Sequence, residues 1–224
     1  MQVNHDPRPM IVTIDGPAGA GKSSAARGLA KRLGYRFLDT GAMYRAVTLA
    51  AREQGIDLAD AEKLAALAER IHVELAGDRV LLDHRDVTEA IRRFEITAAT
   101  YYAADNPAVR ARLVVWQREA AAGSNVVTEG RDQGTVVFPD AEVKVYLVAD
   151  ETERAKRRHR DLVARGEDIP FDEVLSNQIL RDQRDQARSV GALKKADDAI
   201  EVSTDGLTPD EVIARLEEIV RSKQ

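Results

Sequence analysis

The chain has 224 residues, 44% of them hydrophobic and 32% charged, which is ordinary for a globular protein that can bury one full core. Its net charge of −5 argues against a general nucleic-acid binder, and the lack of cysteine excludes disulfides and thiolate metal sites. No apolar run approaches the roughly 18 residues of a membrane-spanning helix, so we expect a cytoplasmic enzyme without nucleic-acid or membrane partners.

The first predicted strand leads into a phosphate-binding loop. Residues 1–9 lack the apolar segment of a signal peptide and are expected to form a loose tail, whereas residues 10–14 predict a short buried strand. The next eight residues read G-P-A-G-A-G-K-S, which fits G-x-x-x-x-G-K-[ST] without a mismatch. Glycines let the loop turn its N–H groups toward a phosphate, and a helix over 22–33 adds the positive end of its dipole.

Within this loop, the lysine can reach the β- and γ-phosphates of a nucleotide, and the serine after it is placed to bind Mg²⁺. The residues predicted to bind ATP here are Gly16, Pro17, Ala18, Gly19, Ala20, Gly21, Lys22, Ser23 and Ser24, with Ser23 as the metal ligand.

A second strand is predicted over residues 35–38, followed by a helix over 42–54 that Asp39 or Thr40 can cap. Arg45 lies in the first turn of that helix, where the helix dipole disfavours a cation. It therefore either points into solvent or faces a bound anion.

Residues 58–115 interrupt the alternation of strands and helices and are interpreted as an insert with a small antiparallel sheet. The stretch is closed by a helix that Asp105 or Asn106 caps, with Arg110 in its first turn. The predicted elements are a helix over 58–70, strands over 73–75, 79–83 and 85–88, and a helix over 109–122.

The main fold resumes with a buried strand over 125–128, which runs into the sequence E-G-R-D at 129–132. In an open parallel sheet, the carboxyl ends of the strands form the edge at which ligands bind. Further strands over 143–148 and 199–202 complete a predicted five-stranded parallel sheet, and a capping box at Thr208 opens the last helix.

Residues 151–165 carry six basic side chains. They form either a solvated basic helix or a mobile cationic flap over phosphates, with Gly166 as a hinge. A long helix over 171–189 is predicted to place Arg181, Asp185 and Arg188 on one face, which ion pairing at the surface would also explain.

A phosphate-binding loop is shared by switch GTPases, motor ATPases and small-molecule kinases, and three features favour a kinase. The chain has no N-K-x-D sequence to read guanine, its arginines recur at strand ends and helix starts, and its two inserts would let an acceptor domain and a lid close over the site. No histidine stands in a recognisable catalytic motif, as expected when the acceptor is a phosphate that needs no general base. A nucleotide-binding switch without catalysis is the rival interpretation.

Between about residues 10 and 220 the chain resembles bacterial cytidylate kinases. The matching stretches are the phosphate-binding loop, D-T-G-A-M-Y-R at 39–45, E-G-R-D-Q-G-T-V-V-F-P-D-A at 129–141, and R-D-Q-R-D-Q-A-R at 181–188. The resemblance implies an α/β three-layer fold and ATP-dependent phosphorylation of CMP and dCMP with Mg²⁺. No large exposed apolar stripe is evident in the sequence, so a monomer is expected by default. It also implies one kinase domain, 1–224, with a core at 10–57, 123–153 and 189–224, a nucleoside-monophosphate-binding insert at about 58–115, and a lid at about 154–172.

The resemblance also implies roles for individual residues. The phosphate of the acceptor would be clamped by Arg45, Arg131 and Arg188, its ribose held by Arg181 and Asp185, and its cytosine read by Arg110 and Asp132. Arg157 and Arg158 would lie over the ATP phosphates, and catalysis would fall to Lys22, Arg131, Arg157, Arg158 and Arg188. Further acceptor contacts are expected from Asp39, Thr40, Tyr44, Tyr101 and Gly130.

Three positions depart from the family pattern. Tyr101 stands where the family usually has a serine that contacts the base, so the pocket differs there or Thr97 or Thr100 takes over. This keeps UMP or another nucleoside monophosphate open as the acceptor. Gln133 replaces a residue that is more often apolar and Ala192 replaces a common proline, and both changes are expected to be minor.

Overall fold

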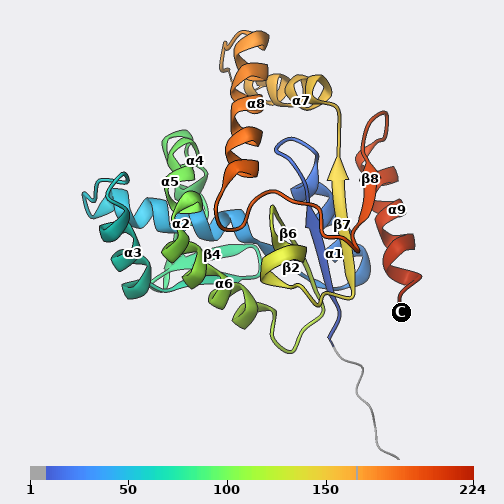
Figure 1. Cartoon of the computed structure of the whole chain (residues 1–224), viewed down its shortest axis with the longest axis horizontal. Coiled ribbons are helices and arrows are strands. Elements are labelled where there is room, and N and C mark those ends of the chain that lie inside the picture. The colour runs from blue at the N-terminus through green and yellow to red at the C-terminus, as the bar shows by residue number, and fades with distance from the viewer. Residues whose placement is uncertain (1–8, 165) are drawn as a thin grey trace, which may run out of the picture.

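The computed structural model describes residues 9–164 and 166–224; the rest of the predicted tail and Arg165 lie outside the described residues. Its centre is a five-stranded parallel sheet in the order β2-β6-β1-β7-β8 (Figure 1), as predicted. The strands are β1 (Ile11–Asp15), β2 (Arg36–Asp39), β6 (Val126–Gly130), β7 (Val143–Val148) and β8 (Ile200–Ser203).

Helices cover both faces of this sheet and give three layers. One core joins the strands to α1 (Lys22–Leu33) and α9 (Pro209–Arg221) through residues such as Leu29 and Leu216, both fully buried. The other core lies under α2 (Thr40–Glu53) and α6 (Pro107–Ala121), where Trp116 is buried. The buried residues of these helices are the ones that pack against the sheet.

The insert between α2 and α6 contains the small antiparallel sheet that the alternating residues predict, in the order β3-β4-β5. The short helices that follow it have three to six residues, too few for the apolar repeat that reveals a helix in sequence. The elements are α3 (Ala61–Arg70), β3 (Val73–Ala76), β4 (Arg79–Leu82), β5 (Arg85–Asp86), η1 (Ala90–Arg92), α4 (Phe94–Ala99) and α5 (Tyr101–Asp105).

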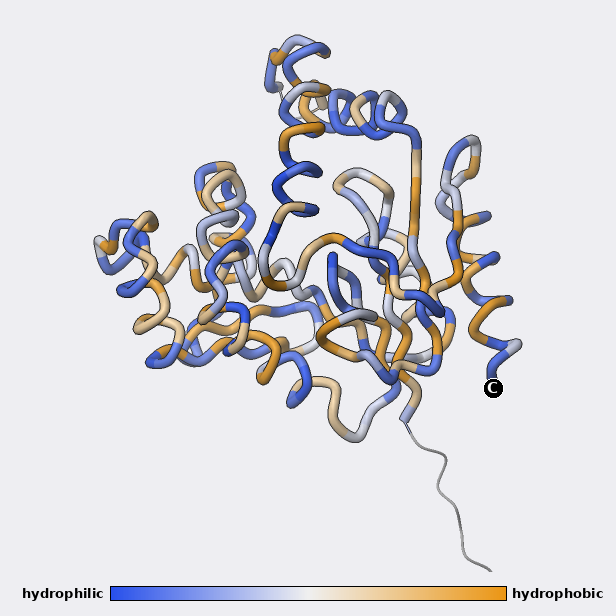
Figure 2. Tube along the Cα trace, viewed as in Figure 1, coloured by the Kyte–Doolittle hydropathy of each residue, from blue (hydrophilic) through white to orange (hydrophobic). Residues whose placement is uncertain are grey.

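Two helices, α7 (Glu151–Ala164) and α8 (Phe171–Ala187), form a hairpin that projects beyond the carboxyl edge of the main sheet (Figure 1). Hydrophilic residues dominate both helices (Figure 2). No helix in the described parts of the chain is long and apolar enough to cross a membrane.

Several local expectations are corrected. β6 continues to Gly130, and η2 (Gln133–Val137) is a π-helical turn that no sequence pattern signalled. α8 ends at Ala187, so Arg188 lies just past the helix instead of on its face. Of the alternative caps, Asp39 caps α2 and Asn106 caps α6, each accepting a hydrogen bond from the first turn.

Candidate active site

The phosphate-binding loop lies at the carboxyl end of β1 and packs closely against its surroundings. Gly16 has a φ of 147°, and a Cβ on it would lie 2.1 Å from the carbonyl oxygen of Leu147. A Cβ on Gly19 would lie 3.1 Å from the Cβ of Arg154. The loop therefore depends on glycine for its backbone conformation and for room.

Lys22 is buried at the start of α1, and its Nζ donates to the carbonyl oxygen of Pro17 at 2.6 Å. Burial, and then the positive charge of Arg131, lower the pKa of Lys22 to about 7. A buried ammonium beside other cations is stabilised by an anion, as the phosphates of a nucleotide would provide.

Beside it, the Ser23 hydroxyl donates to Glu129 Oε1 at 2.8 Å. The described residues hold no cluster of three or more acidic or histidine side chains that could bind a metal alone. Mg²⁺ commonly takes one or two protein oxygens and completes its shell with water and phosphate, so this hydroxyl–carboxylate pair fits it. Glu129 was given no role in the sequence analysis. Its position at the carboxyl end of a predicted strand is the signal that could have identified it.

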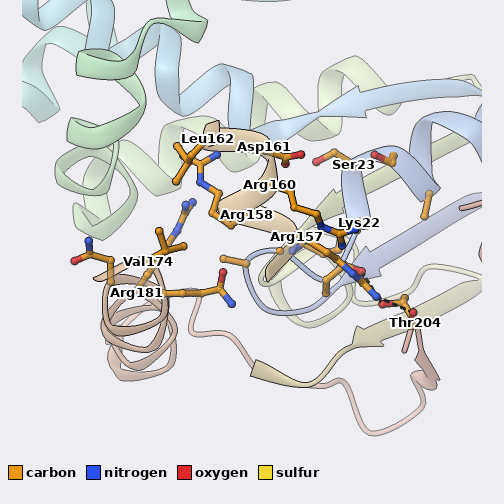
Figure 3. A pocket seen from close by; sticks show the side chains of 18 of the residues that line it. Lys22, Ser23, Arg157, Arg158, Arg160, Asp161, Leu162, Val174, Arg181 and Thr204 are labelled. Carbon is orange, nitrogen blue, oxygen red and sulfur yellow. Dashed lines mark hydrogen bonds between the residues drawn. The ribbon is translucent and has the colours of Figure 1, made fainter. Parts of the chain in front are cut away.

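A cavity of about 960 Å³ extends from this loop to the α7–α8 hairpin (Figure 3). Its lining includes Arg157, Arg158 and Arg181, together with Phe94 and Thr97 from the insert. Arg157 also donates to the side-chain and backbone oxygens of Thr204, both at 2.9 Å. Basic side chains from the hairpin thus face the phosphate-binding loop across one cavity.

The basic residues of α7 do not all face the cavity. Arg154 is buried, ion-paired with Asp182, and donates to the carbonyl oxygen of Ala18 at 2.9 Å. Asp182 in turn accepts from the backbone N–H of Ala18 at 3.2 Å. This pair fastens the base of the hairpin to the phosphate-binding loop, a role that sequence analysis missed because Arg154 looks like its basic neighbours.

A second group of charges lies outside the lining of that cavity and includes Arg45, Arg131 and Arg188, the arginines expected to clamp the acceptor phosphate. Arg131 Nε donates to Asp185 at 2.6 Å, and Arg188 pairs with both Asp185 and Asp105. Burial raises the pKa of Asp185, but the cations Arg131 and Arg188 outweigh it and leave the pKa below its usual value. Arg45, on α2, pairs with Asp39, the N-cap residue of the same helix, with 3.3 Å between Arg45 Nη2 and Asp39 Oδ2.

Arg110 and Asp132 form a buried ion pair next to this group, each with at most 5% of its side chain exposed. The guanidinium also lies 5.6 Å from the ring centre of Tyr44. Gly191 leaves it room, because a Cβ there would lie 1.8 Å from Arg110 Nη2. Burial raises the pKa of Asp132 above its usual value, while Arg110 opposes the rise.

Tyr101 is placed differently from these residues. It is 39% exposed, stacks on Tyr102 at 4.2 Å and lies under the guanidinium of Arg184 at 5.5 Å. Of the two threonines considered in its place, Thr97 lines the large cavity, whereas Thr100 donates to the carbonyl oxygen of Ile96.

Asp15, at the end of β1, is a buried residue beside the site that the sequence did not single out. Its carboxylate accepts from the backbone N–H groups of Gln133 and Gly134 at 2.9 and 2.8 Å, and burial raises its pKa to about 7. It thereby holds η2 against β1, directly after Arg131 and Asp132.

Known proteins resemble the chain over nearly its whole length. A family model described as cytidylate kinase matches residues 12–222. A cytidylate kinase of Rhodopirellula baltica is 50% identical over 212 residues, which cover 95% of this chain and 93% of that protein. One from Carboxydothermus hydrogenoformans is 46% identical, with coverages of 96% and 98%. A solved structure of shikimate kinase from Bacteroides thetaiotaomicron is similar in fold, with a TM-score of 0.50, 14% identity, and coverages of 95% and 98%.

Proposed function

The chain belongs to the cytidylate kinase family, and on that premise we propose that it transfers the γ-phosphoryl group of ATP in line to CMP and dCMP, yielding CDP and dCDP in pyrimidine nucleotide metabolism. The observation that best supports this proposal is the presence of two separate cationic groups at one sheet edge. One surrounds the phosphate-binding loop and the other holds Arg131 and Arg188. Transfer between two phosphates requires both, because each substrate brings its own negative charge.

On the donor side, the loop from Gly16 to Ser24 would bind the ATP phosphates, with Lys22 on the β- and γ-phosphates. Arg157 and Arg158 would approach the same phosphates from the hairpin, which is supported by their place in the lining of the large cavity. Ser23 would ligate Mg²⁺ and Glu129 would orient its shell; the ion, when bound, would neutralise charge on the phosphates.

On the acceptor side, Arg45, Arg131 and Arg188 would bind the CMP phosphate, while Arg181 and Asp185 would hold the ribose hydroxyls. The ion pairs that Arg45, Arg131 and Arg188 make in this structure would exchange for bonds to the substrate. Arg110 and Asp132 would read the cytosine, since a carboxylate accepts from its amino group and a guanidinium donates to its ring acceptors. Asp39, Tyr44, Tyr101 and Gly130 would complete the site. The Thr40 hydroxyl donates to the carbonyl oxygen of Glu129, which supports a positioning role for it.

The proposed mechanism needs no general base, because the phosphate that attacks is already largely ionised at neutral pH. Rate acceleration would come from alignment of the two substrates and from cations that stabilise the charge of the transition state. Closure of the hairpin over the cavity would exclude water that otherwise hydrolyses ATP.

The proposal includes the division into a core at 10–57, 123–153 and 189–224, an insert at about 58–115 and a lid at about 154–172. It also includes a monomer located in the cytoplasm, where nucleotide pools are kept. Light scattering after gel filtration tests the monomer: a mass near 24.7 kDa supports it, and twice that mass contradicts it.

A coupled ADP-release assay with ATP and Mg²⁺ tests the activity, with CMP, dCMP, UMP, AMP and GMP as acceptors. CMP and dCMP are expected to react far faster than the others. Preference for UMP would leave the phosphate chemistry in place and contradict the roles of Arg110 and Asp132. A chain that binds ATP but neither binds CMP nor turns it over would be the nucleotide-binding switch instead.

A further inference from the structure

The turn η2 begins at a residue that does not cap it with its own side chain. Asp132 is the N-cap residue of η2, and aspartate is favoured at this position because its carboxylate can accept from the first N–H groups. The Asp132 side chain makes no such hydrogen bond. It forms the ion pair with Arg110 instead, with at most 5% of either side chain exposed. The first N–H groups of η2 therefore need an acceptor from elsewhere in the chain.

That acceptor is Asp15, at the end of the central strand β1. Its Oδ1 accepts from the backbone N–H of Gln133 at 2.9 Å, and its Oδ2 accepts from that of Gly134 at 2.8 Å. These are the first two residues of η2, and they follow Asp15 by 118 and 119 positions along the chain. Asp15 is only 4% exposed, so both oxygens of a buried carboxylate hold the start of this turn.

The backbone of η2 in turn holds Asp132. The carbonyl oxygen of Asp132 accepts from the N–H groups of Val136 at 2.9 Å and Val137 at 3.1 Å. The main chain on both sides of the Asp132 side chain is thus fixed without the use of its carboxylate. If Asp15 did not accept from the start of η2, two buried N–H groups would lack a partner, and the Asp132 carboxylate is the group placed by sequence to cap them.

We propose that Asp15 is a positioning residue for base recognition, which caps η2 in place of Asp132 and so leaves the Asp132 carboxylate free to face Arg110 and the cytosine of the acceptor. This inference rests on the proposed function, because it takes Asp132 to read the cytosine. It gives a role in acceptor recognition to a residue that directly precedes the phosphate-binding loop.

The test compares Asp15→Asn and Asp15→Ser with the unmodified chain. Each variant keeps one oxygen that can accept from η2 and leaves the other N–H group without a partner, so the Asp132 carboxylate is expected to turn toward it. The measured quantity is the ratio of kcat/KM for CMP to kcat/KM for UMP. We expect this ratio to fall about tenfold, the effect of losing one hydrogen bond between a carboxylate and the cytosine amino group.

The conditions separate base recognition from other effects of Asp15. The assay is made at pH 8, because burial raises the pKa of Asp15 to about 7 and most of its carboxyl groups are ionised above that value. ATP is saturating and common to both acceptors, so a change confined to the phosphate-binding loop would not alter the ratio. Thermal unfolding shows which of the two Asp15 variants is folded at the temperature of the assay.

Arg118→Met is the matched control, at the other end of the same turn. Arg118 donates to the carbonyl oxygens of Val136 and Val137, at 3.1 and 2.9 Å. Its loss should lower Tm but leave the ratio unchanged, because the start of η2 keeps Asp15 as its acceptor.

A second comparison places Asp15 and Asp132 in series. Asp132→Asn should lower the ratio by itself. Asp15→Asn should lower it no further in that background, because residues that act through one another are not additive.

The outcomes are distinct. An unchanged ratio in a folded Asp15 variant, an equal fall in Arg118→Met, or additive effects of Asp15→Asn and Asp132→Asn would each overturn this inference while the proposed function stands. If the unmodified chain does not prefer CMP to UMP, the proposed function fails and this inference fails with it.

Discussion

Asp182→Asn is the change whose effect on stability follows most directly from the structure. Arg154 and Asp182 are ion-paired with 4% and 10% of their side chains exposed, so removal of the carboxylate charge leaves a guanidinium buried without a counter-charge. Breaking a buried pair in this way costs about 3–5 kcal/mol of the free energy of unfolding. In a chain of this size that corresponds to a fall in Tm of about 6–20 °C.

The same two residues fix the phosphate-binding loop, because the N–H of Ala18 donates to Asp182 and its carbonyl oxygen accepts from Arg154. We therefore expect Asp182→Asn also to weaken ATP binding, measured by calorimetry. The double change Arg154→Met with Asp182→Leu removes both charges and should restore most of the stability, though not the ATP affinity.

Urea unfolding followed by circular dichroism measures the free energy. Glu153→Gln is the control, since it breaks the exposed pair with Lys156 and should cost less than about 1 kcal/mol. If Asp182→Asn costs no more than this control, the pair does not fasten the hairpin to the loop and the reasoning is refuted.

Three further predictions concern the substrates. Gly191→Ala should raise KM for CMP severalfold, because the added Cβ displaces Arg110. Gly206→Ala is the control and should leave KM unchanged, since Gly206 has nearly the same φ (70° against 68° for Gly191) but open space around it. Equal effects of the two changes would point to backbone strain alone. Burial lowers the pKa of Lys22 to about 7, so at pH 8 this lysine is mostly neutral in the chain without ATP. ATP phosphates raise that pKa, and binding should take up close to one proton, measured by calorimetry in two buffers; no uptake contradicts the contact. Glu129→Gln should raise the Mg²⁺ concentration needed for half-maximal rate, and an unchanged requirement would remove Glu129 from the metal site.

The sequence by itself determined the features that are encoded locally. The glycines and the lysine of the phosphate-binding loop lie within eight consecutive residues, and short apolar runs mark the strands as buried. The antiparallel hairpin of the insert also shows in its alternating residues. These patterns were enough to predict the parallel sheet, the small second sheet and the site edge.

Only the tertiary structure decided which polar groups meet. The basic residues of α7 look alike in sequence, yet Arg154 is buried against Asp182 while Arg157 and Arg158 face the cavity. Ser23 meets Glu129 across 106 positions of the chain. The pattern of apolar residues shows that a segment is buried, because burial of apolar area does not depend on direction. A hydrogen bond or ion pair depends on the placement of two particular atoms, and the packing of the whole chain decides that placement.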